Sequence, residues 1–176
     1  MPSLPLRYYG DPVLRKRAEE VTVFDEELKK FAQDLIDTVY AHPAAGMAAP
    51  QVGKSLRIFA SRNFYVRPDG YYEYTDVDVY INPKITILGD ELEDDMEGCL
   101  SIPGIREYVI RPKKVRIEAV DMHGKPIVHE LEGYKARNIL HENDHINGVL
   151  FIDRIDKKAR NKIDPVLRSI KKKYNP

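Results

Sequence analysis

The chain of 176 residues contains a single cysteine, Cys99, so an intramolecular disulfide is excluded. A lone cysteine is an inert buried thiol, a nucleophile or a metal ligand, and the residue by itself does not separate these three roles. The formal net charge is zero, with 28 basic and 28 acidic residues. No overall field therefore favours nucleic acid or an anionic membrane as a partner.

Long apolar runs are also absent from the sequence. No window approaches the length that is needed to span a bilayer. Residues 1–7 show neither the apolar core of a signal peptide nor the pattern of a transit peptide, so we expect a cytoplasmic protein. Charged residues make up 32% and apolar residues 43% of the chain. These values and this length predict one globular domain, residues 1–176, with a sizeable core.

Local patterns predict helices and strands along the chain. Apolar residues at helical spacing predict an amphipathic helix over residues 25–40. A second helix is expected from Gly133 to Asn147-Gly148, and a third over about residues 156–175, where Pro165 leaves open one kinked helix or two short ones. Short strands are expected at residues 56–60, 85–88, 115–120 and 127–131, with a tyrosine-rich hairpin over 63–79 that turns at 67–70.

The segment 141–145 has the sequence HENDH, with two histidines four residues apart and Glu142 directly after the first. On an α-helix, side chains at i and i+4 leave the same face one turn apart. His141 and His145 can therefore reach one metal ion, while Glu142 is offset towards a water on that ion. The same spacing also occurs on solvated helix faces. Tyr134 and Asn138 extend this stripe, which is too polar for a packed core and suits a helix that lines a metal cleft.

A third metal ligand separates the alternatives. Metalloproteases of the metzincin type continue as HExxHxxGxxH, and here Gly148 matches the glycine but Phe151 stands where the last histidine is required. Other zincins use a later glutamate, and the chain has no glutamate after Phe151. Upstream, Cys99 is a soft ligand. Two imidazoles and one thiolate with an open fourth position are typical of a catalytic site rather than a structural one.

Three motifs resemble those of the peptide deformylase family. Residues 97–101 match its EGCLS motif, residues 141–145 match its HExxH motif, and residues 46–51 match most of its GxGxAAPQ motif. They occur in the family's order and at similar intervals. One departure is Ala44, which stands at the first glycine of GxGxAAPQ. Because alanine lacks the access of glycine to positive φ, we expect the entry to this loop to be set differently.

The resemblance implies an α+β fold, with antiparallel β-sheets packed around a central HExxH helix and with N- and C-terminal helices. It implies a hydrolase that removes the N-formyl group from the N-terminal formylmethionine of newly synthesised proteins and releases formate. One divalent metal ion would be held by Cys99, His141 and His145. Fe²⁺ is the usual native ion of the family, with Zn²⁺, Ni²⁺ or Co²⁺ also found. The implied partners are N-formylmethionyl nascent polypeptides near the ribosome, with no specific nucleic acid and no membrane.

The resemblance also implies roles for individual groups. Metal-bound water attacks the formyl carbonyl, and Glu142 acts as general base and then as general acid. The Gln51 side-chain amide and the backbone N–H of Leu100 stabilise the oxyanion. The helix face of Tyr134, Arg137 and Asn138 is expected to contribute to the pocket for the methionine side chain, although Arg137 is equally suited to a structural ion pair. Further substrate contacts are expected at Ala45, Gly46, Gly98 and Arg106.

Two alternatives to an active deformylase remain open from the sequence. The first is a peptidase that uses the HExxH helix to cleave peptide bonds. The second is a deformylase-like binding protein that has lost turnover through the altered loop at Ala44. Formate release from a formyl-methionyl peptide distinguishes an active deformylase from both alternatives.

Overall fold

The computed structural model describes residues 3–176. Residues 1 and 2, which belong to the N-terminal segment 1–7 discussed above, lie outside the described residues. The helices are α1 (Glu26–Ala41), α2 (Tyr134–Ile146) and α3 (Lys157–Tyr174), with short 3₁₀ helices at Pro12–Arg15, Ala49–Val52 and Phe151–Asp153. The strands are β1 (Gly46–Ala48), β2 (Ile58–Val66), β3 (Tyr72–Ile87), β4 (Leu92–Cys99), β5 (Ile102–Pro112), β6 (Lys114–Val120) and β7 (Pro126–Glu132). None of the described helices is both long and apolar enough to cross a membrane.

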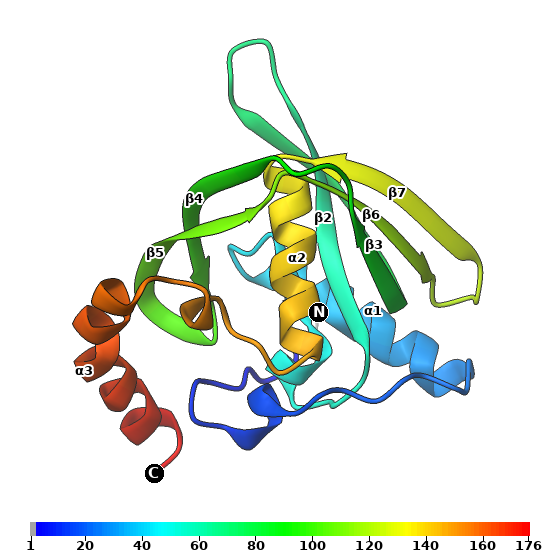
Figure 1. Cartoon of the computed structure of the whole chain (residues 1–176). Coiled ribbons are helices and arrows are strands. Elements are labelled where there is room, and N and C mark those ends of the chain that lie inside the picture. Colours follow the sequence, from blue (N-terminus) through cyan, green and yellow to red (C-terminus); the bar gives the residue numbers. More distant parts are fainter. Residues whose placement is uncertain (1–2) are drawn as a thin grey trace.

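The strands form two antiparallel sheets on either side of α2 (Figure 1). The first has the order β1-β2-β3-β6-β7, and the second consists of β4 and β5. Helix α2 packs against strands of both sheets, while α1 packs on β1, β2 and β3, and α3 packs on β5. The α+β arrangement around a central HExxH helix, with a helix towards each end of the chain, is therefore confirmed.

Three clusters of buried apolar side chains fix these elements. The first joins α1 to the five-stranded sheet, the second joins β5 to α3, and the third joins α2 to the other face of the five-stranded sheet. Examples from the three clusters in turn are Leu35 and Ile58, Val109 and Leu167, and Phe59 and Ile139. Helix α2 thus has one side in the core, and the position of its polar side is set by that packing.

The predicted helices are confirmed at their ends. The side chain of Asp25 caps α1 by accepting a hydrogen bond from the backbone N–H of Leu28. Helix α1 therefore begins at Glu26, one residue later than expected. The side chain of Asp156 does the same for Ala159 at the start of α3. Pro165 lies inside α3, which is one continuous helix, so the alternative of two short helices is wrong.

The strand expected at residues 85–88 is not a separate element. It is the end of β3, whose pairing is irregular between Ile81 and Lys84. Asn82 has a φ of 51°, and its side chain exchanges two hydrogen bonds of 2.9 Å with the backbone of Val21. Because the sequence Asn82-Pro83 at this irregularity is typical of the end of a strand, the sequence predicted two strands where the structure has one. The hairpin turn at 67–70 is confirmed, and it joins β2 to β3 at the projecting tip in Figure 1.

Candidate metal centre

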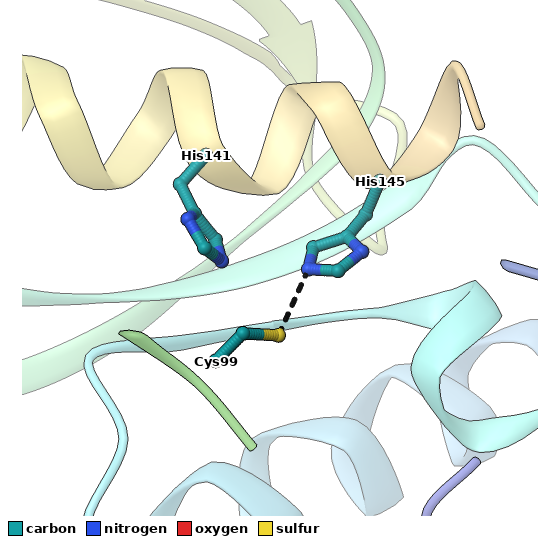
Figure 2. A group of neighbouring side chains, drawn as sticks. All are labelled: Cys99, His141 and His145. Carbon is teal, nitrogen blue, oxygen red and sulfur yellow. Dashed lines mark hydrogen bonds between the residues drawn. The ribbon is translucent and has the colours of Figure 1, made fainter. Parts of the chain in front are cut away.

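Helix α2 and the end of β4 bring three metal-binding side chains together. The ligand atoms of Cys99, His141 and His145 all lie within 4.8 Å of one another. The sulfur of Cys99 is 3.4 Å from Nε2 of His145, and both imidazoles project from one face of α2 towards it (Figure 2). This is the arrangement that the spacing of the histidines and the resemblance implied.

Glu97 orients one of the two imidazoles. Its Oε1 lies 2.7 Å from Nδ1 of His141, which leaves Nε2 of His141 to face the cluster. Burial by itself raises the pKa of Glu97, but hydrogen bonds from Arg111 and His141 prevail and hold that pKa far below its usual range. A charged carboxylate on the outer nitrogen of a histidine fixes the ring and its tautomer, as it does at many metal sites.

A buried chain of charges continues from Glu97 to α2. Arg111 donates to both carboxylate oxygens of Glu97, at 2.6 and 2.8 Å, and to Asp144 at 2.8 Å. Asp144 also accepts two hydrogen bonds from Arg154, at 2.7 and 2.8 Å. The side chains of Glu97, Arg111 and Asp144 are at most 9% exposed. This network of buried charges joins β4, β5 and α2. It therefore fixes the position of β4, which carries Cys99, relative to α2, which carries the two histidines.

Replacing Arg111 with methionine is expected to lower the free energy of unfolding by about 3–5 kcal/mol, because it removes one partner of a buried ion pair and leaves carboxylates uncompensated. Urea unfolding of metal-loaded protein measures the change. Arg168→Met is the matched control, because Arg168 pairs with Asp164 on the surface of α3 and its side chain is 80% exposed. That variant should change the free energy by at most about 0.5 kcal/mol. An equal decrease in the free energy of unfolding in both variants would show that the network of buried charges adds no stability of its own.

Glu142 is buried beside the metal-binding cluster. Within residues 3–176 its Oε2 has no hydrogen-bond partner. Burial is the largest influence on this carboxyl group and raises the pKa of Glu142 to about 7. A Cβ placed on Gly46 would lie 2.7 Å from the carbonyl oxygen of Ala60 and 3.0 Å from Cγ of Glu142. Glycine is therefore required at position 46 for the backbone of β1 to approach Glu142 this closely.

The residues present fit a divalent metal ion. The donors are one sulfur and two imidazole nitrogens, a set that accepts several borderline metals. Burial is also the main reason that the pKa of His145 lies well below its usual value, which favours the neutral form of the ring that binds metals. The carboxylate of Glu142 follows His141 on α2 and lines the cavity, where a reacting water would find an acceptor.

Gln51 lies against the same cluster. Its Nε2 is 3.4 Å from the sulfur of Cys99 and 3.2 Å from the hydroxyl oxygen of Ser101, and its Oε1 accepts from the backbone N–H of Ala48 at 2.9 Å. Sequence reasoning did not single out Ser101, although it is the last residue of the EGCLS segment and is fully buried. Its position in that motif was the available signal.

A cavity of about 500 Å³ opens beside the metal-binding cluster. With the exception of His145, every site residue expected from the sequence lines it. These residues are Ala45, Gly46, Gln51, Gly98, Cys99, Leu100, Arg106, His141 and Glu142. The polar stripe of α2 adds Tyr134, Arg137 and Asn138 to the same wall, together with Met96 and Ile105 from β4 and β5.

Two expectations about this wall are now answered. Arg137 forms an ion pair, with Nη1 2.7 Å from Glu97, and it also donates to the carbonyl oxygens of Val109 and Glu93, so it serves as a structural residue within the cavity wall. Ala44 lines the cavity and does not adopt positive φ, which among the described non-glycine residues occurs at Asn82. Alanine at position 44 therefore introduces no left-handed backbone strain.

Comparisons with known proteins agree with this geometry. A family model described as polypeptide deformylase matches residues 3–161. The peptide deformylase of Thermotoga maritima is 42% identical over 171 residues, which cover 95% of this chain and 98% of the relative. A mutant of Arabidopsis thaliana peptide deformylase 1B has a similar structure, with a TM-score of 0.86, 36% identity, and 97% and 92% of the two chains covered. The peptide deformylase of Thermus thermophilus has a TM-score of 0.85 and 38% identity, with 98% and 99% covered.

Proposed function

Because this chain belongs to the peptide deformylase family, whose curated members are enzymes, we propose that it hydrolyses the N-formyl group of N-terminal formylmethionine. Water and the formamide are converted to formate and a free amino terminus. The observation that carries the proposal is the meeting of three metal ligands within 4.8 Å, next to a cavity that Glu142 lines.

We assign Cys99, His141 and His145 as the residues that hold one divalent metal ion. When bound, such an ion supplies Lewis acidity, which lowers the pKa of water and polarises a carbonyl group. Fe²⁺ as the native ion stays a prediction, because this donor set also accepts Zn²⁺, Ni²⁺ and Co²⁺. Metal analysis after anaerobic purification tests it. The anaerobic conditions protect the thiolate of Cys99 from oxidation.

Glu142 moves the proton in the proposed reaction. Its carboxylate, which lines the cavity, accepts a proton from the attacking water and then delivers it to the nitrogen of the leaving amine. A carboxyl group with a pKa near 7 both accepts and donates a proton readily at neutral pH.

Gln51 and Leu100 are proposed to stabilise the oxyanion that forms on the formyl oxygen. The Gln51 amide and the backbone N–H of Leu100 are the donors. Because Nε2 of Gln51 contacts Cys99 and Ser101, one of these two contacts must be exchanged for the oxyanion. Gln51 and Leu100 can act on the same oxyanion, because Leu100 directly follows Cys99 and lines the same cavity as Gln51.

The substrate peptide is proposed to lie extended between the two sheets. β1 is the edge strand of the five-stranded sheet, and Gly46 pairs with Ser61 on one side only. β4 also has one unpaired side, and Gly98 lies near its end. A peptide strand between these edges would form backbone hydrogen bonds near Ala45, Gly46 and Gly98, with Arg106 alongside. Formylated nascent chains near the ribosome and a cytoplasmic location stay predictions.

Incubation with a formyl-methionyl peptide and its unformylated twin tests the proposed function. We expect formate and the free amine from the first peptide and no change in the second, because the reacting amide is the formyl group. Formate assay and mass spectrometry of both mixtures measure the outcome. Cleavage of an internal peptide bond without formate would contradict the proposal and favour the peptidase.

A further inference from the structure

Residues 7–9 connect the two parts of the chain that carry the proposed oxyanion donors. The backbone N–H of Arg7 donates to the carbonyl oxygen of Gln51 at 2.7 Å, and the backbone N–H of Tyr9 donates to the carbonyl oxygen of Ser101 at 2.9 Å. Because two residues of chain span at most about 7 Å, this segment holds the two carbonyl groups close together. Residues 7–9 do not line the cavity, and the proposed mechanism does not use them.

Each of these two hydrogen bonds lies next to an oxyanion donor. Gln51 carries its amide on the short 3₁₀ helix Ala49–Val52, so the position of this backbone sets the position of the amide. Leu100 and Ser101 are the two residues between β4 and β5. The hydrogen bond to Ser101 therefore restrains the same turn that presents the backbone N–H of Leu100.

The C-terminal end of α3 holds residues 7–9 from another side (Figure 1). Nδ2 of Asn175, the residue that follows α3, donates to the carbonyl oxygen of Tyr9 at 2.9 Å and to that of Tyr8 at 3.4 Å. The ring of Tyr8 also stacks on that of Tyr174, with 3.8 Å between the ring centroids. The side chain of Asn175 thus contacts two consecutive carbonyl groups, and it restrains both the position and the direction of the segment.

We propose that Asn175 is a positioning residue for the proposed reaction. It holds residues 7–9 in place, and these residues keep Gln51 and Leu100 at the separation at which both donate to one oxyanion. This inference rests on the proposed function, because the oxyanion forms only when the formyl group is hydrolysed. Oxyanion donors act through a geometry that is fixed in advance, so a small displacement of one donor lowers the rate of the chemical step.

Replacing Asn175 with aspartate tests the proposal, because aspartate has nearly the same size but its carboxylate only accepts hydrogen bonds and repels the two carbonyl groups. In metal-loaded protein we expect kcat for formate release to fall about three- to tenfold, which is less than the effect of losing a whole oxyanion donor. KM and the metal content should stay at the wild-type values. Asn161→Asp is the matched control, because Asn161 is exposed on α3 and should keep the wild-type kcat.

A double-mutant cycle with Gln51→Ala separates positioning from a general loss of structure. When Gln51 has lost its amide, Leu100 is the one remaining proposed donor of the pair, and the separation of the two donors no longer matters. Adding Asn175→Asp to Gln51→Ala should therefore leave kcat nearly unchanged, as single-turnover formate assays measure. A decrease by the same factor in both backgrounds would overturn the proposal, because the effect of Asn175 would then not pass through Gln51.

The other results also separate this inference from the proposed function. A wild-type kcat in Asn175→Asp would overturn the role of Asn175, even if the free energy of unfolding falls. If Asn175→Asp does not fold, Tyr174→Ala replaces it in the same cycle, since it removes the ring on which Tyr8 stacks and should lower kcat in the same direction. Absence of formate in the metal-loaded wild type would overturn the proposed function itself.

Discussion

Replacing Glu142 with glutamine is expected to lower kcat for formate release by about 10²–10⁴-fold, because the variant loses the group that accepts and donates the proton. Glutamine preserves the volume of a side chain that is tightly packed against Gly46. The bound metal should stay in place, since Glu142 is not one of the three ligands that meet within 4.8 Å. Single-turnover and steady-state formate assays, with metal analysis of the same preparation, measure both quantities.

Glu118→Gln is the matched control for this experiment. Glu118 is exposed on β6 and does not line the cavity, so the same chemical change there should leave kcat unaltered. A kcat that Glu142→Gln leaves near the wild-type value would show that another group moves the proton. Loss of metal in parallel with activity would show instead that Glu142 belongs to the ligand set.

The elements that the sequence predicted well are those with one apolar face. α1 and the β6–β7 hairpin follow simple periodic patterns, since one side of each packs on the core and the other faces water. Strand β4 does not follow such a pattern. Its buried residue Glu97 is charged, while Leu92 is 64% exposed, so its pattern is the reverse of an ordinary strand. Arg111 on β5 neutralises the buried carboxylate, and this pairing between two strands has no local signature in the sequence.

The candidate site divides in the same way. The spacing of His141, Glu142 and His145 is a local helical property, so the geometry could be predicted from one segment. Cys99 lies on a different element, so helical spacing could not identify it. It was predicted as a ligand from the chemistry of its thiolate and from the resemblance. The supporting chain from Glu97 through Arg111 and Asp144 was not predicted. Glu97 and Asp144 lie inside the two motifs, but their shared partner Arg111 lies outside both.

Replacing Cys99 with serine, or His141 with alanine, is expected to reduce the bound metal to a small fraction of the wild-type content and to abolish formate release with it. Each change removes one of three protein ligands, and a neutral hydroxyl is a much weaker ligand than a thiolate for borderline divalent ions. Metal analysis of anaerobically purified protein gives the content per chain. His123→Ala is the control, because His123 is exposed in the turn between β6 and β7 and should keep the metal.

Comparison of these variants with Glu142→Gln separates binding of the metal from use of the metal. If Cys99 and His141 are ligands, their variants lose metal and activity together, and excess metal in the assay should restore part of the activity by mass action. Glu142→Gln should keep the metal and gain nothing from the excess. Full metal content in Cys99→Ser would contradict the assignment of the thiolate. The sulfur would then serve only as a hydrogen-bond partner of the Gln51 amide and of Nε2 of His145, each 3.4 Å away.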